Sequence, residues 1–175
     1  MRTPAALVCA LTLSAQSSRI ENLAPYYPTP EPIVDRMLQL GNLQAGEKMF
    51  DLGSGDGRIV ILAASKYHAD ATGVEFEDTL VKQSIKRIKT RGLASSARII
   101  QGDLLKQDYS SADLLTVYLL PIASQRLRPI LEKQLKKGAR VVSHNADFPE
   151  WTPVKIEEIN DDGQGHSHRL YLYQR

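Results

Sequence analysis

Apolar and polar positions along the chain alternate between the two spacings that distinguish strands from helices. Short, largely apolar runs of strand length lie at residues 49–52, 71–75, 97–101, 114–120 and 139–144. Between them, apolar residues three and four positions apart predict helices over residues 58–67, 78–91 and 124–137, with an earlier helix over residues 30–40. Strands that alternate with helices in this way predict an α/β fold around a parallel sheet.

The ends of these elements carry further signals. Thr29 is a plausible N-cap with Pro30 at the first helical position. Pro129 is expected to divide the helix over residues 124–137, and Gly138 stops it. Two last apolar runs, at residues 154–159 and 170–173, predict a C-terminal antiparallel hairpin.

The turn after the first strand carries three alternating glycines: residues 49–61 read MFDLGSGDGRIVI. Gly53, Gly55 and Gly57 can adopt positive φ and let a ligand contact bare backbone, and the N–H groups opening the next helix point at that ligand. A dinucleotide fingerprint has its third glycine one place later, where Arg58 stands. Asp51 would repel a pyrophosphate and suits a ligand that carries an ammonium group.

Two more acids follow strands whose carboxyl ends should meet at the same edge of the sheet. Glu75 closes the second predicted strand and is placed for bidentate hydrogen bonds to ribose hydroxyls. Asp103 follows the third and could accept a hydrogen bond from an adenine amino group, while the neighbouring Leu104 covers the ring.

Composition sets limits on the chemistry. The 175 residues fit one domain, and a formal charge of +2 names no polyanionic partner. The single cysteine, Cys9, excludes an internal disulfide framework and a cysteine-based zinc site. His144, His166 and His168 are expected to be structural rather than metal ligands or a general base, and no metal site is predicted. The basic face of residues 82–91 is expected to be solvated, with RNA contact as the lesser alternative.

The first 20 residues contain no acid, and Arg2 precedes an apolar run at residues 5–13. This outline is typical of a secretory signal, with an organellar address as the alternative, and the apolar run is too short to span a bilayer. We therefore divide the chain into a signal-like leader, residues 1–20, and one domain, residues 21–175.

The glycine turn resembles motif I of the class I S-adenosylmethionine (SAM) methyltransferases. Five parallel strands with a C-terminal hairpin are similar to their Rossmann-like, mostly parallel seven-stranded sheet. A closer resemblance is to the family of lysine N-methyltransferases that act on the c-subunit of ATP synthase and on the adenine nucleotide translocase, with small bacterial relatives. The matching segments cover nearly everything after residue 22 and include residues 25–29, 51–60, 118–121 and 148–153.

Two features of the leader bear on this resemblance. The long membrane-associated segment of the eukaryotic members is reduced here to a short leader, which argues against the implied membrane-protein substrate. Export or membrane association through the leader also conflicts with SAM supply in the cytoplasm, so the sequence leaves the location open.

The resemblance implies a SAM-dependent methyltransferase that releases S-adenosyl-L-homocysteine and N-methylates a protein lysine. The implied SAM-binding residues are Tyr27, Thr29, Asp51, Gly53, Ser54, Gly55, Asp56, Gly57, Glu75, Phe76, Asp103, Leu104 and Tyr118. The implied catalytic residues are the aromatic side chains of Tyr27, Tyr118 and Trp151, which would form a dry channel for the amine. Tyr26 belongs to the same predicted gate.

Other acceptors remain open. Enzymes that methylate base or glutamine amides often carry an Asn/Asp-Pro-Pro-aromatic motif after the fourth strand, and the segment Tyr118-Leu119-Leu120-Pro121 lacks its polar first residue. A small-molecule amine or hydroxyl is therefore the second acceptor and nucleic acid the third. A SAM- or nucleotide-binding module without catalysis is the alternative of a different class. We expect a monomer.

Overall fold

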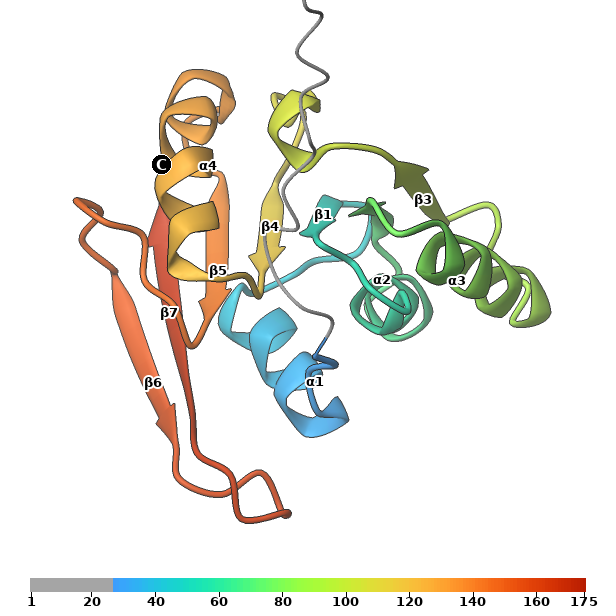
Figure 1. Cartoon of the computed structure of the whole chain (residues 1–175), viewed down its shortest axis with the longest axis horizontal. Coiled ribbons are helices and arrows are strands. Elements are labelled where there is room, and N and C mark those ends of the chain that lie inside the picture. The colour runs from blue at the N-terminus through green and yellow to red at the C-terminus, as the bar shows by residue number, and fades with distance from the viewer. Residues whose placement is uncertain (1–26) are drawn as a thin grey trace, which may run out of the picture.

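The computed structural model describes residues 27–175 and shows a seven-stranded α/β sheet. The strand order is β3-β2-β1-β4-β5-β7-β6, so β3 and β6 form the two edges (Figure 1). Strands β1 to β5 pair in parallel, whereas β7 runs antiparallel to both β5 and β6. The predicted Rossmann-like sheet and C-terminal hairpin are thereby confirmed. The leader and Tyr26 lie outside the described residues.

The elements follow the predicted order. The strands are β1 (Lys48–Leu52), β2 (Asp70–Glu75), β3 (Ala97–Gln101), β4 (Leu114–Val117), β5 (Arg140–His144), β6 (Lys155–Ile159) and β7 (His168–Gln174). The α-helices are α1 (Glu31–Leu40), α2 (Arg58–Lys66), α3 (Asp78–Thr90) and α4 (Pro121–Gln134), and a short 3₁₀ helix η1 covers Leu104–Lys106.

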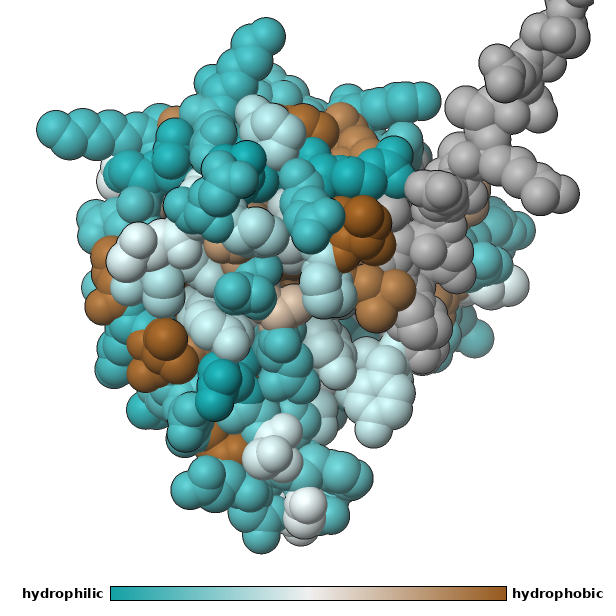
Figure 2. Space-filling model, turned by 60° about the vertical axis from the view of Figure 1, so that its left-hand side comes forward, coloured by the Kyte–Doolittle hydropathy of each residue, from teal (hydrophilic) through white to brown (hydrophobic). Residues whose placement is uncertain are grey.

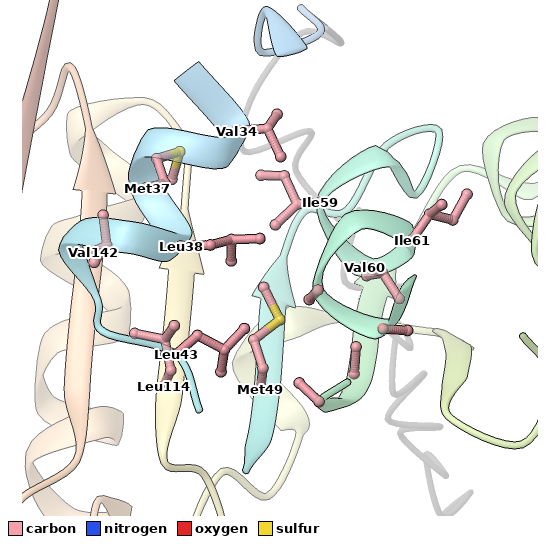
Figure 3. Packing of buried hydrophobic residues seen from close by; sticks show 14 of the residues in the cluster. Val34, Met37, Leu38, Leu43, Met49, Ile59, Val60, Ile61, Leu114 and Val142 are labelled. Atoms are coloured by element: carbon pink, nitrogen blue, oxygen red, sulfur yellow. The ribbon is translucent and has the colours of Figure 1, made fainter. Parts of the chain in front are cut away.

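Helices cover both faces of the sheet because successive strand residues point to opposite sides. Met49 and Leu114 join the core with α1 and α2, whereas their neighbours Phe50 and Leu115 join the core beneath α4. In the first core, Val34 and Leu38 of α1 point toward α2, and Leu43 lies beside Leu114 (Figure 3). Strands buried on both faces explain the continuous apolar runs in the sequence.

Three local predictions are wrong. Pro30, not Thr29, is the N-cap of α1, and no side chain caps that end. Helix α4 is continuous through Pro129 and begins earlier than predicted, with Pro121 in its first turn. Strand β4 ends at Val117, so residues 118–120 belong to the loop that leads into α4. Proline lacks an N–H donor but keeps a helical φ, and burial of Leu127 and Leu131 on both sides of Pro129 holds the helix together.

The surface offers no extended apolar face in the view of Figure 2, where hydrophobic side chains are separated by hydrophilic ones. Exposed large hydrophobic residues nevertheless occur at Tyr27, Phe76, Leu120 and Ile122, all close in sequence to the carboxyl ends of strands or to α1. Among residues 27–175, no helix is long and apolar enough to cross a membrane.

Candidate functional site

The strand order of the sheet reverses between β1 and β4, which makes this pair the topological switch point. Strand β1 pairs with β2 on one side and with β4 on the other, so the connections leaving β1 and β4 diverge. In open α/β sheets, ligands bind beyond the carboxyl ends of the strands at this switch point. The residues that follow β1, β2 and β4 therefore surround one place.

The glycine turn adopts the backbone that its sequence predicts. Gly53, Gly55 and Gly57 have φ of 79°, 51° and 76°. The N–H groups of Gly53 and Ser54 both donate to the carbonyl of Val74, at 2.9 and 3.0 Å, which fixes the turn against β2. A Cβ added at Gly53 would lie 2.8 Å from a methyl carbon of Leu119, so no larger residue fits there without displacing that side chain.

Asp51, at the end of β1, is a buried carboxylate, only 3% exposed. Thr116 on the neighbouring strand donates its hydroxyl to Asp51 Oδ1 at 2.7 Å. Within residues 27–175 no cation forms an ion pair with Asp51, and the nearby charges are those of Glu75 and Asp56. Burial raises the pKa of Asp51 to about 7, and the two neighbouring carboxylates add to that rise against the hydrogen bond from Thr116.

Glu75 connects the end of β2 to the glycine turn. Its Oε2 accepts the N–H of Gly55 at 2.8 Å, and its Oε1 accepts the N–H groups of Phe76 and Glu77, also at 2.8 Å. A carboxylate offers about four acceptor positions, so three are occupied and one on Oε2 remains for a ligand hydroxyl. Glu75 therefore shapes the turn in addition to offering an acceptor.

The carboxylate of Asp56 is engaged by two arginine side chains of the protein. Its buried carboxylate accepts from Arg58, with the Nε–Oδ1 distance 2.9 Å, and also pairs with Arg87 of α3. Burial acts to raise the pKa of Asp56, but the hydrogen bonds and charges of Arg58 and Arg87 outweigh it and lower the pKa. Arg58 also donates to the carbonyl of Thr29 at 2.8 Å. The turn is thus tied to α3 and to the segment that enters α1.

The groups predicted to hold an adenine ring lie beyond β2 and β3. Phe76 is 47% exposed, and Leu104 is half-buried in the first turn of η1. Asp103 accepts the N–H of Leu105 at 2.9 Å through Oδ1, which caps η1. Gln101, which ends β3, pairs with Glu75, which ends β2. Phe76, Asp103 and Leu104 therefore follow adjacent strand ends.

Tyr118, which follows β4, lies near Tyr27. The side chain of Asn145 hydrogen-bonds Tyr118, and Tyr27 lies near enough to act on the charge of Tyr118. Burial raises the pKa of Tyr118 against that hydrogen bond. Tyr27 itself is 61% exposed, whereas Thr29 is buried.

Trp151 is not brought to these tyrosines. Its indole N–H donates to Glu132 on the last part of α4 at 2.8 Å, its ring stacks on Phe148, and the guanidinium of Arg175 lies over it. Its neighbour Tyr173 pairs with Val141 near the start of β5, which is the opposite end of the sheet from the glycine turn. The predicted gate therefore lacks Trp151, whose contacts serve packing under α4.

Sequence reasoning missed Thr116, Arg87 and Asn145. A threonine in the apolar run of residues 114–120 was a usable signal, because a buried hydroxyl needs a partner. Arg87 was grouped with a solvated basic face, and nothing in its helical spacing distinguishes it from the lysines beside it. Asn145 has a φ of 59°, a conformation that asparagine tolerates, but only the packed structure requires it there.

These residues fit SAM better than a nucleotide pyrophosphate. SAM brings an ammonium and a sulfonium, and Asp51 is a buried carboxylate without a cation among the described residues. Asp51 would hold the ammonium, Glu75 a ribose hydroxyl, and Asp103 with Leu104 and Phe76 the adenine. A pyrophosphate would need free backbone N–H donors in the glycine turn, and the N–H of Ser54 already donates to the carbonyl of Val74.

Comparisons with known proteins point the same way. The sequence profile of the ANTKMT methyltransferase domain matches residues 51–155. A protein-lysine N-methyltransferase of Saccharolobus islandicus (strain REY15A) is 38% identical over 150 residues, which cover 85% of this chain and 92% of that protein. The lysine N-methyltransferase of the ATP synthase C-subunit in Homo sapiens is 33% identical over 132 residues, which cover 75% of this chain and 56% of the human protein.

A solved structure is similar as well. It is described as an RNA methyltransferase from Salinibacter ruber in complex with S-adenosyl-L-homocysteine. It is 42% identical with a TM-score of 0.78, and the match covers 85% of this chain and 93% of that one.

Asp51→Asn is expected to separate binding from stability. The neutral amide keeps an acceptor for Thr116 but loses the charge, so SAM affinity should fall roughly 10- to 100-fold, as for a charge-assisted hydrogen bond. Because burial raises the pKa of Asp51 to about 7 in the folded protein, this group lowers stability progressively as pH rises from about 4 to about 7. The variant should therefore melt at a higher temperature than the wild-type protein at pH 8, with the difference vanishing below about pH 4, the usual pKa of an aspartate.

Calorimetry and thermal melts at pH 5 and pH 8 measure both effects. Wild-type affinity should also weaken as pH falls below 7, because SAM must then displace a proton. Asp113→Asn is the matched control: this carboxylate bonds Lys48 and Lys136 at the opposite end of the sheet, so SAM affinity should not change. Full SAM affinity in Asp51→Asn would place the ammonium elsewhere.

Glu75→Gln is expected to weaken SAM binding roughly 10- to 100-fold and to lower stability as well. The glutamine keeps one acceptor oxygen, while its NH₂ group faces at least one of three backbone N–H donors. Calorimetry measures the affinity and denaturant unfolding the stability. Glu77→Gln, an exposed neighbour whose carboxylate accepts from Thr79, is the control. Loss of stability with normal affinity would assign Glu75 to the turn alone.

Tyr27→Ala and Trp151→Ala are expected to affect different properties, methyl transfer in the first case and stability in the second. Removing Tyr27 opens the wall shared with Tyr118, so methyl transfer should slow while the free energy of unfolding hardly changes. Removing Trp151 should cost stability on the order of 3 kcal/mol through lost packing. Urea unfolding and single-turnover transfer distinguish them, and equal stability losses would refute the separate roles.

Proposed function

The chain belongs to the ANTKMT methyltransferase domain family, whose members use SAM, and on that premise we propose that it methylates the side-chain amine of a protein lysine. The observation that carries the lysine assignment is the similarity to the Saccharolobus islandicus protein-lysine N-methyltransferase over 85% of this chain and 92% of that protein. The match to the human ATP synthase enzyme covers about half of that protein, so its particular substrate is not transferred here.

The site supports an amine acceptor on chemical grounds. The pKa of a lysine ammonium, about 10.4, lies about 3.4 units above pH 7. Forming the neutral amine at pH 7 therefore costs roughly 4.6 kcal/mol. A second cation beside the sulfonium is disfavoured, and a low-dielectric wall adds to that effect. The half-buried Tyr118 provides such a wall, and its ring and that of Tyr27 can hold the methylated product by cation–π contact.

The residues of this chain contribute mainly by positioning. When bound, SAM supplies an electrophilic methyl group on sulfur. Asp51 and the glycine turn fix one end of the cleft, and Glu75 fixes the next strand end. Arg58 ties the segment bearing Tyr27 to the same turn through Thr29, so the wall and the cofactor-binding turn keep a fixed relation. Such alignment is the main source of rate in a displacement reaction.

RNA is the second candidate, because the Salinibacter ruber structure carries that description at 42% identity. Part of the basic face of α3 is already engaged here: Arg87 pairs with Asp56, and Lys82 pairs with Asp78. The loop after β4 also presents Tyr118 where amide- and base-methylating enzymes often place a polar acceptor. Both observations favour lysine over a nucleobase.

Labelling with radioactive SAM in a cell lysate separates these functions. We expect label in macromolecules that survives ribonuclease, disappears from the precipitate after protease, and yields methyl-lysine on acid hydrolysis. Asp51→Asn at limiting SAM is the matched control and should give much less label. Label that ribonuclease removes would establish RNA as the acceptor, and label only in small molecules would refute both.

A further inference from the structure

Three polar side chains form a buried line behind the tyrosine wall. His144, the last residue of β5, is fully buried, and its Nε2 lies 2.8 Å from Nδ1 of His168 on β7. His168 Nε2 lies 3.1 Å from Oδ2 of Asp162, whose side chain is also buried. The three groups are joined end to end rather than gathered around a point, and among residues 27–175 no cluster has the arrangement of a metal site.

The carboxylate at one end fixes every proton along this line. Burial acts to raise the pKa of Asp162, but the hydrogen bond from His168 and the N–H groups of Gln164 and His166 outweigh it and lower the pKa to about 2. An ionised Asp162 only accepts, so a neutral His168 carries its proton on Nε2 and accepts on Nδ1. His144 must then donate from Nε2, which leaves its own Nδ1 bare.

That bare nitrogen is otherwise unexplained. His144 Nδ1 is buried and has no hydrogen-bond partner among the described residues, a costly state for a polar atom. Burial and the nearby His168 lower the pKa of His144 to about 3, so the ring is neutral in the empty protein. A buried, neutral imidazole with a free lone pair is an acceptor without a donor.

The position of His144 places its ring beside Tyr118. Val117 pairs with Ser143 at the last register position of β4 and β5, so Tyr118 and His144 are the next residues at the same strand ends. Their rings are 4.0 Å apart between centroids, tilted by 35°. His144 therefore backs the wall against which the acceptor amine is proposed to lie.

We propose that His144 and His168 form a proton relay for the acceptor ammonium, an inference that rests on the proposed lysine substrate. The N–H bond of the ammonium breaks, its electron pair stays on nitrogen, and the proton binds Nδ1 of His144 directly or through one water. The Nε2 proton of His144 passes to Nδ1 of His168 in the same movement. The acceptor is left as a neutral amine, and His168 becomes an imidazolium.

The charge thus comes to rest beside a carboxylate instead of on the most buried ring. Asp162 remains ionised and stabilises the His168 imidazolium, as the aspartate does for histidine in a Ser-His-Asp triad. Tyr118 is the other titratable group against His144. Around Asp162 lie the exposed His166, with Nδ1 at 3.6 Å, and a cavity of about 410 Å³ bordered by Arg36 and Asp161.

Nitrogen NMR of histidine-labelled protein tests the proton arrangement without any methyl transfer. At pH 7 we expect His144 as the neutral tautomer with its proton on Nε2, and His168 with a protonated Nε2. A proton on Nδ1 of His144, or an imidazolium there, would overturn the relay.

His144→Gln tests the proton transfer itself, because the glutamine amide can still donate to His168 but offers no base at the position of Nδ1. With the ribonuclease-treated protein fraction of a lysate as acceptor, single-turnover transfer at pH 7 should fall roughly 10²- to 10⁴-fold. The deficit should shrink as pH approaches the pKa of free lysine, about 10.4, where solvent supplies the neutral amine. His168→Gln should behave similarly, while His166→Gln, next to the same carboxylate but outside the line, should keep the wild-type rate.

The outcomes separate the two proposals. An unchanged rate at pH 7, or a deficit equally large at pH 7 and pH 10 in a variant that melts cooperatively, overturns the relay and leaves lysine methylation standing. A wild-type protein that transfers label only to RNA overturns the lysine assignment.

Discussion

A carboxylate held out of water is the constraint on which the site depends. Asp51 is buried at the end of β1, and within the described residues it has a hydroxyl partner, Thr116, but no cation. The empty protein is therefore destabilised when this group ionises, and a cationic ligand removes that cost. We expect the same feature that lowers stability to favour SAM over ligands that carry a pyrophosphate. This is a common relation between strained sites and function.

The glycine turn would be of little use without the contacts that hold it. Glu75 binds Gly55 from β2, and Arg87 binds Asp56 from α3. Arg58, at the position where a dinucleotide fingerprint has glycine, bonds Asp56 and also reaches the carbonyl of Thr29. One turn thus connects the cofactor crevice to the segment that carries Tyr27. A methyltransferase gains from this arrangement because donor and acceptor must be aligned, and no side chain has to act as a nucleophile.

Behind the crevice, the antiparallel strand β7 has a chemical consequence in addition to closing the sheet. Its pairing with β5 places His168 near His144, and the hairpin turn places Asp162 beside His168. These residues are distant in sequence, and each alone would be an ordinary member of a strand or a turn. Together they give a buried line of hydrogen bonds with a defined proton order next to Tyr118.

Local signals in the sequence were sufficient to predict the order of strands and helices and the positive φ of the three glycines. They were also sufficient to place the acids at the ends of β1, β2 and β3. Periodicity, glycines and strand ends are each visible within a few residues. The continuity of α4 through Pro129 was decided by burial of the residues around it. Tertiary packing alone separated Trp151 from the tyrosines, committed Asp56 to two arginines, and linked His144 to His168. Such pairings depend on which strands become neighbours and on which side chains are buried together, and neither is written in local spacing.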